Sequence, residues 1–204
     1  MIIAISGKAQ AGKDTVAKMI VYTIWYYTYS QRLDSFGINH YNYCINNFKQ
    51  LMLRIQWRKT SFAEKLKLCL ANILKVSLDK FEDIEFKNSK VNWLDMTVRE
   101  LLQKFGTAIR NEICDDFWVN VCLKDYDESQ NWIISDVRFK SEIEGIKQFN
   151  NITLRVNNSS AGAGNHISEV DLDDYKFDYI INNNGSLEEL LFKVKEFCLI
   201  NKII

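Results

Sequence analysis

A short glycine-bearing segment near the start of the chain carries the strongest chemical signal. Residues 7–15 read Gly-Lys-Ala-Gln-Ala-Gly-Lys-Asp-Thr, which has the spacing G-x-x-x-x-G-K. In such a loop the glycines let backbone N–H groups point inward, and these donors, with the N-terminus of a following helix, hold phosphate oxygens. The lysine would then bridge the β- and γ-phosphates of ATP. The loop residues predicted to bind phosphate are Gly7, Ala9, Gln10, Ala11, Gly12, Lys13, Asp14 and Thr15.

The residue after Lys13 differs from the usual pattern. A Ser or Thr normally follows the lysine and binds magnesium through its hydroxyl, whereas this chain has Asp14 and then Thr15. A carboxylate can reach magnesium directly or through water, and the Thr15 hydroxyl can donate to the α-phosphate. We therefore predict Mg²⁺ as the cofactor, with Asp14 as its ligand. The alternative, a chance glycine turn, does not explain the strand and helix patterns on either side.

Those flanking patterns belong to an alternation of strands and helices. A continuous apolar run at residues 2–6 predicts a buried strand, and helical spacing follows from Lys13 to Tyr29. The alternation predicts an α/β fold with a largely parallel sheet. Residues 79–96 are interpreted as irregular, and residues 30–58 as a partly helical insertion. Further strands are predicted at 59–62, 132–135, 152–156 and 177–181. Further helices are predicted at 63–76 and 141–149. Two more helices are expected to begin at the capping boxes of residues 97–100 and 186–189, and the second of these is predicted to end at about residue 199.

A second candidate site follows the apolar run 132–135. Asp136 comes directly after this predicted strand, and Arg138 lies two residues further on. In open α/β sheets, ligands bind at the carboxyl ends of the strands. Asp136 could hold a magnesium shell or a substrate hydroxyl, and Arg138 could grip a phosphate with its planar fork. Alternatively, Asp136 caps the next helix and Arg138 lies on a solvated face.

A third candidate is a polar stripe formed by Arg99, Gln103, Gly106 and Arg110, provided that one helix continues through all four. It could line a phosphate site, or it could be the wet face of an amphipathic helix. Trp118 could stack on a base or belong to the core. The pair at residues 115–116 is interpreted as a helix N-cap.

The composition excludes several functions. Lys plus Arg and Asp plus Glu number 26 each, so the net charge of zero argues against broad nucleic-acid binding. There is no signal-peptide pattern and no apolar run of 18 residues, so we expect no membrane association and a cytoplasmic location. The five scattered cysteines are expected to be reduced and buried. A GTP-dependent switch would show an Asn-Lys-x-Asp segment late in the chain, and none is present.

These segments, taken in order, resemble the deoxynucleoside monophosphate kinases of phages and related viruses. The resemblance rests on the phosphate loop with Asp14 and on residues 61–67, 99–107, 135–139, 166–169 and 177–190. It implies a P-loop NTPase-like three-layer sandwich of the nucleoside monophosphate kinase type, with a mostly parallel five-stranded sheet and helices on both faces. The length of the chain fits a single domain, 1–204, with the insertion at 30–58, and the resemblance implies a lid-like loop at 157–175.

The resemblance implies transfer of the ATP γ-phosphate to a deoxynucleoside monophosphate, in the host cytoplasm if the protein is viral. Phosphomevalonate and dephospho-coenzyme A kinases remain alternatives, as does a nucleotide-binding protein without catalysis; a homodimer is left open. The implied catalytic residues are Lys13 and Arg138. The implied substrate-binding residues are Lys67, Gln103, Gly106, Thr107, Arg110, Trp118, Asp136 and Arg138.

The lid-like loop at 157–175 contains no Lys or Arg. It therefore cannot neutralise the charge that builds on the transferred phosphoryl group. We expect this loop to exclude water, and Arg155, at the end of its predicted strand, to supply the missing cation. The alternative is that Arg155 is a surface strand residue.

Overall fold

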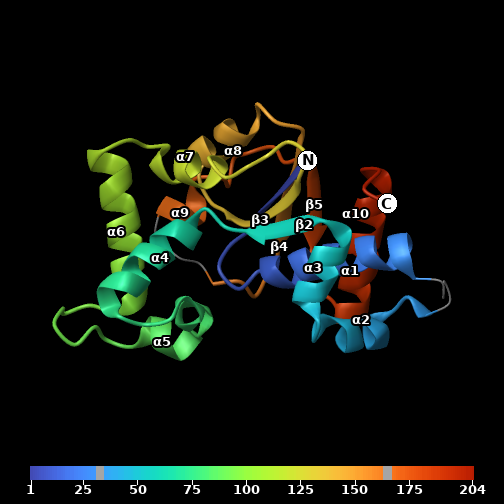
Figure 1. Cartoon of the computed structure of the whole chain (residues 1–204), viewed down its shortest axis with the longest axis horizontal. Helices are drawn as coiled ribbons and strands as arrows, with labels where there is room; N and C mark the ends of the chain where they lie inside the picture. The colour runs from blue at the N-terminus through green and yellow to red at the C-terminus, as the bar shows by residue number, and fades with distance from the viewer. Residues whose placement is uncertain (31–34, 163–166) are drawn as a thin grey trace. The chain divides into compact units, whose positions relative to one another are not determined.

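The computed structural model describes residues 1–30, 35–162 and 167–204, and within these ranges five strands form one parallel sheet (Figure 1). Its spatial order is β2-β3-β1-β4-β5, and each neighbouring pair is parallel. The carboxyl ends of all strands therefore share one edge, which is where ligands bind in open α/β sheets. The strands are β1 Ile2–Ser6, β2 Trp57–Thr60, β3 Asn131–Val137, β4 Asn151–Asn157 and β5 Tyr179–Asn182.

Helices occupy the connections between the strands. The first unit, residues 1–60 and 127–204, contains the sheet, and the second unit spans residues 61–126. The helices of the first unit are α1 Lys13–Tyr29, α2 Ile38–Ile45, α3 Phe48–Ile55, α8 Lys140–Ile146, α9 Ile167–Val170 and α10 Leu187–Ile200. Those of the second unit are α4 Ala63–Leu74, the 3₁₀ helix η2 Leu78–Glu82, α5 Ile84–Asn88, α6 Val98–Glu112 and α7 Phe117–Leu123.

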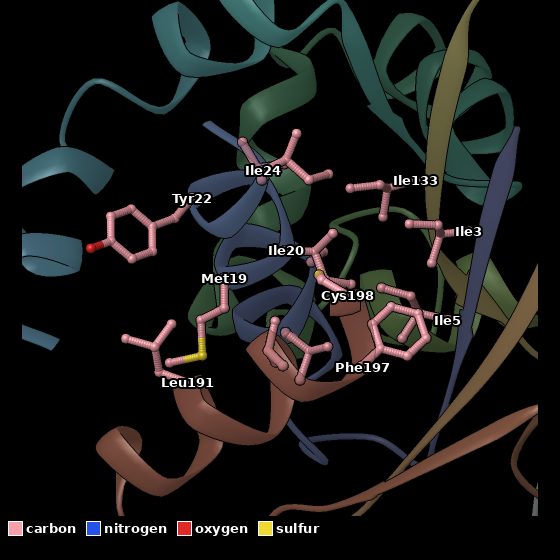
Figure 2. Packing of buried hydrophobic residues seen from close by; sticks show 14 of the residues in the cluster. Ile3, Ile5, Met19, Ile20, Tyr22, Ile24, Ile133, Leu191, Phe197 and Cys198 are labelled. Carbon is pink, nitrogen blue, oxygen red and sulfur yellow. The ribbon is translucent and has the colours of Figure 1, made fainter. Parts of the chain in front are cut away.

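Both faces of the sheet are buried at β1, as the exposure of its alternating residues shows. Ile3 and Ile5 of β1 belong to the same apolar cluster as buried residues of α1 and α10, and Figure 2 shows Met19, Leu191 and Phe197 in that cluster. Ile2 and Ala4 alternate with them along the strand and are equally inaccessible, as expected for a strand covered on both faces. The expected α/β class, with a five-stranded parallel sheet surrounded by helices, is confirmed.

Several predicted boundaries were wrong, for local reasons. The second strand ends at Thr60 rather than at Phe62, because Phe62 is the buried N-cap residue of α4. The fifth strand starts at Tyr179, since the Asp178 carboxylate accepts hydrogen bonds from the backbone N–H and hydroxyl of Thr153. Helix α8 ends at Ile146, whose carbonyl accepts a hydrogen bond from the Asn151 side chain.

Residues 79–96 are more regular than predicted. They hold most of η2 and all of α5, with Asp83 capping α5 by accepting from the N–H of Glu85.

The expectation that the cysteines are buried was wrong for two of them, because Cys69 and Cys114 are exposed. In the described residues, no helix is long and apolar enough to cross a membrane.

The second unit has its own apolar core. Leu66 and Leu70 of α4, Phe81, Val98 and Trp118 are buried together. Helix α6 begins with the predicted capping box, in which the Thr97 hydroxyl accepts from the N–H of Glu100 and the Glu100 carboxylate accepts from the N–H of Thr97. Because α6 runs unbroken over residues 98–112, the four residues of the predicted polar stripe lie on one helix, as required.

Candidate functional site

The phosphate loop connects β1 to α1 and has an unusual backbone. Gly7 has φ 154° and Gly12 has φ 97°, so both lie where side chains are disfavoured, and a Cβ at Gly7 would overlap the carbonyl oxygen of Val156. Gln10 also has a positive φ, 65°. The N–H of Ala11 donates to the carbonyl of Lys8 at 3.2 Å. These turns fold the segment into a tight loop ahead of the α1 N-terminus, as the motif predicts.

The asparagine turn after β5 supports this loop. Asn183 donates from its side-chain amide to the carbonyl of Ala11 at 3.0 Å, and a Cβ on Gly12 would overlap the same amide. The backbone N–H of Asn183 is bonded to the carbonyl of Asn157 at 2.7 Å. Residues 182–185 were predicted only as a turn, so their contact with the phosphate loop was missed.

Lys13 folds back over the loop. Its Nζ donates to the carbonyl oxygens of Gly7 at 2.6 Å and Lys8 at 2.7 Å. The ammonium group therefore lies at the loop itself, where the phosphates of a nucleotide would be held. A bound phosphate offers this lysine charged oxygens, which make stronger hydrogen bonds than neutral carbonyls do.

Asp14 is held by residues from two strands. Its Oδ1 lies 2.8 Å from the Nζ of Lys59 in β2 and accepts a hydrogen bond from the Ser135 hydroxyl in β3 at 3.2 Å. Ser135 is buried, whereas the Asp14 side chain is 66% exposed. Sequence reasoning treated Lys59 only as a strand residue, and nothing in its local pattern signals this ion pair.

The oxygen donors near the loop suit magnesium. Asp14 at the start of α1 and Asp136 near the end of β3 are carboxylates, and Mg²⁺ prefers oxygen ligands from one or two carboxylates together with substrate phosphates. The described ranges contain no cluster of three or more His, Cys, Asp or Glu residues that could hold a metal. This arrangement fits a metal that binds together with nucleotide phosphates.

The turn after β3 is fixed by a residue that sequence reasoning missed. The buried carboxylate of Glu142 accepts hydrogen bonds from the backbone N–H groups of Arg138 at 2.6 Å and Phe139 at 3.0 Å. Asp136 lies within β3, and the N-cap residue of α8 is Phe139, so the alternative of Asp136 as a helix cap is wrong. Asp136 and Arg138 therefore lie at the carboxyl edge of β3, next to β1 and its loop.

Arg155 is not a surface residue, since its side chain is only 11% exposed. One guanidinium nitrogen donates to the Ser6 hydroxyl at 3.1 Å and another lies 2.7 Å from Asp173. The same Asp173 carboxylate is 3.5 Å from the Nζ of Lys8 in the phosphate loop. Asp173 therefore joins two cations that a nucleotide phosphate could also attract, and sequence reasoning missed this link.

The later part of the predicted lid is anchored. Asp171 accepts a hydrogen bond from the N–H of Lys140 at 2.7 Å, and Leu172 is buried. Gly164 and His166, which belong to the predicted lid and to one of the resembling segments, lie outside the described residues. The lid remains a prediction.

A cavity of about 410 Å³ opens beside the loop. Its charged lining residues are Lys8 and Arg155, and its other lining residues include both apolar side chains and amide or hydroxyl groups. Two of its lining residues are joined, because the side-chain oxygen of Asn184 accepts from the N–H and the hydroxyl of Ser159. The lining residues are Lys8, Arg155, Val156, Asn157, Asn158, Ser159, Ala161 and Asn184.

The remaining predicted substrate residues belong to the second unit. Trp118 is buried and donates its indole N–H to the carbonyl of Gly106 at 3.1 Å, and a Cβ on Gly106 would lie 3.0 Å from Leu66. Arg110 is paired with Asp115, and Lys67 with Glu82 at 2.8 Å. Gln103 and Thr107 are half-buried on the same helix as Gly106. Their binding roles remain predictions.

The chain is similar to known proteins over most of its length. Residues 34–194 match the family model described as deoxynucleotide monophosphate kinase. The deoxynucleotide monophosphate kinase of Enterobacteria phage T4 is 30% identical over 127 residues, which are 59% of this chain and 51% of the phage protein. The chain thus spans about half the length of that relative. A protein of Acanthamoeba polyphaga mimivirus, provisionally given the same name, is 24% identical over 162 residues, 71% of this chain and 84% of its own.

The family match and the phosphate loop are separate observations, because the loop at residues 7–15 precedes the matched residues. Most of the predicted insertion at 30–58 lies inside the match.

Proposed function

The chain belongs to the deoxynucleotide monophosphate kinase family, and from this premise we propose that it transfers the γ-phosphate of ATP to a deoxynucleoside 5′-monophosphate. The products are the deoxynucleoside diphosphate and ADP. The observation that carries the proposal is the phosphate loop, with Lys13 folded over it, at the carboxyl edge of the sheet. A phosphomevalonate or dephospho-coenzyme A kinase is the alternative that the acceptor assay below distinguishes.

The reaction requires positioned positive charge. An oxygen of the acceptor phosphate attacks the γ-phosphorus, and the bond from that phosphorus to the β–γ bridging oxygen breaks, which leaves ADP. Catalysis of this step rests on positioning and on stabilising negative charge. Lys13 supplies charge at the loop, and Lys8 and Arg155 supply charge beside it.

Asp14 would hold magnesium together with the nucleotide phosphates, with Thr15 and Asp136 as further oxygen donors. The metal would supply charge neutralisation on the phosphates of ATP. The exposed Asp14 carboxylate in the first turn of α1 supports this role.

The cavity beside the loop would take the base and ribose of ATP. It is continuous with the loop through Lys8, and its amide groups can donate to and accept from ring nitrogens. Its volume of about 410 Å³ falls in the range of small-molecule sites.

Arg138 would grip the phosphate of the acceptor. The backbone N–H of Arg138 donates to Glu142, which holds in place the turn that carries the Arg138 side chain. Asp136 lies two residues earlier, near the end of β3. We propose that Lys67, Gln103, Gly106, Thr107, Arg110 and Trp118 bind the acceptor nucleotide, as the resemblance implies.

We propose that Arg155 replaces a lid arginine, and that the segment 157–175 excludes water. The low exposure of Arg155 and its position between Ser6 and Asp173 support this role. The partners in this proposal are ATP and the deoxynucleotide, and the zero net charge argues against nucleic acid as a further partner. The viral origin of the relatives supports a site of action in the host cytoplasm.

Substitution of Lys13 tests the proposal. Lys13→Ala should lower turnover of ATP with a deoxynucleoside monophosphate by about 10²-fold or more, because it removes charge aimed at the transferred group. Turnover is followed by coupled detection of ADP, and Lys147→Ala serves as the control. Lys147 pairs with Glu144 just before β4 begins, and therefore lies near the amino ends of the strands, away from the loop. Near-normal turnover in folded Lys13→Ala would contradict the proposal.

A further inference from the structure

The carboxylate of Asp14 places a negative charge where nucleotide phosphates are expected to bind. Loops of this pattern usually have a neutral Ser or Thr hydroxyl at this position. The N-terminus of α1 favours an anion there, but it favours the phosphates for the same reason. Without a counter-charge, Asp14 and a polyphosphate would repel each other across a few ångströms.

Lys59 provides that counter-charge from a distant strand. It lies in the edge strand β2, opposite Ile133 of β3, and its side chain reaches Asp14 in the first turn of α1. Its Nζ is 2.8 Å from Asp14 Oδ1, and its side chain is 26% exposed. The Ser135 hydroxyl, from a residue two positions beyond Ile133 in β3, donates to the same oxygen at 3.2 Å. Two strands therefore fix one carboxylate oxygen.

An ordinary surface ion pair explains this arrangement poorly. The positive end of a helix dipole disfavours a cation, so the ammonium group is held there by the carboxylate rather than by the helix. Exposed ion pairs add little to stability. The pair nevertheless lies in the first turn of α1, directly after the loop in the chain, so the state of the Asp14 carboxylate bears on any anion that the loop binds.

We propose that Lys59 is a positioning residue of the nucleotide site, which neutralises and orients Asp14 so that the loop accepts a polyphosphate before a divalent cation is bound. A divalent cation at Asp14 supplies positive charge to the same carboxylate, and so makes Lys59 less important for binding. This inference rests on the proposed function only to the extent that the loop binds nucleotide.

Calorimetric titration of ADP tests this role without catalysis. Each protein is titrated once in excess EDTA and once in excess Mg²⁺. With EDTA, Lys59→Met should bind ADP about tenfold more weakly than the wild type, a loss of about 1.4 kcal/mol. With Mg²⁺ the loss should be clearly smaller. Lys59→Arg, which keeps the charge, should bind nearly as the wild type does.

A double substitution separates this role from a structural one. In an Asp14→Ser background the carboxylate is gone, so adding Lys59→Met should change ADP binding in EDTA by less than about twofold. Lys147→Met, which breaks an ion pair near the amino ends of the strands, should leave the ADP affinity unchanged. Melting temperatures of all variants establish that they are folded.

Two results would overturn the inference. One is unchanged ADP affinity of Lys59→Met in EDTA, and the other is an equal loss in the Asp14 and Asp14→Ser backgrounds. Wild-type protein that binds ADP but phosphorylates no deoxynucleotide would contradict the proposed function while leaving this test decisive. Wild-type protein that binds no ADP would overturn both.

Discussion

At the scale of single residues, the site is built from charges that the chain supplies at several separate positions. Lys13 lies over its own loop, Lys59 reaches Asp14 from an edge strand, and Arg155 is linked to the loop through Asp173. The phosphate-loop pattern indicates only the first of these cations. Lys59 and Arg155 lie in two other strands, and in a parallel sheet the carboxyl ends of all strands share one edge with the loop.

Arg155 allows a residue-scale prediction. If Arg155 has the proposed role, Arg155→Ala should lower kcat at saturating ATP and acceptor by about tenfold or more, because it removes a preorganised cation from the transition state. Arg155→Lys should retain part of the activity, since it keeps the charge but loses the planar fork. The measurement is a steady-state assay alongside thermal melting.

Arg58→Ala provides the matched control. Arg58 is also a strand arginine, but it lies over the ring of Trp132, with 4.7 Å from its guanidinium carbon to the ring centre. Its removal should leave kcat unchanged. An unchanged kcat in Arg155→Ala would contradict a catalytic role for Arg155.

At the scale of elements, the apolar patterns predicted the strands and helices better than their ends. The buried run of β1 and the capping box of α6 were recognisable because they depend on neighbouring residues. The start of β5 was not recognisable, because it depends on Asp178 bonding to Thr153, 25 positions earlier. Lys59 and Asp173 were missed for the same reason, since each acts through a contact made by the folded chain.

The cysteines test the element packing directly. Cys198 is a residue of α10 and belongs to the apolar cluster that α10 shares with α1 (Figure 2). Burial raises the pKa of its thiol to about 12. Burial also raises the pKa of Cys44. The thiolate is the reactive form, so a raised pKa lowers reactivity at pH 8. The exposed Cys69 should therefore react first with a thiol reagent.

Cys114 should follow more slowly than Cys69, because its hydrogen bond to Asp116 raises the pKa of this exposed thiol. The three buried cysteines should react only after denaturation. The order is read by mass spectrometry of tryptic peptides after timed labelling. Rapid labelling of Cys198 in the native protein would contradict the packing of α10 against α1.

At the scale of the whole molecule, the chain divides its predicted tasks between two compact units. The first unit holds the phosphate loop, Asp136, Arg138 and Arg155, and the second holds the remaining residues expected to bind the acceptor. Family membership covers parts of both, since the match spans residues 34–194. The identity of the acceptor is therefore the property on which the account as a whole depends.

Direct detection of the phosphorylated acceptor tests this central claim. The enzyme is incubated with γ-labelled ATP, Mg²⁺ and, one at a time, each deoxynucleoside monophosphate, phosphomevalonate or dephospho-coenzyme A, and the labelled product is separated by chromatography. We predict labelled deoxynucleoside diphosphate from at least one deoxynucleotide, with the label absent when Lys13→Ala replaces the wild type. Label transferred only to phosphomevalonate or dephospho-coenzyme A, with none to any deoxynucleotide, would contradict the account.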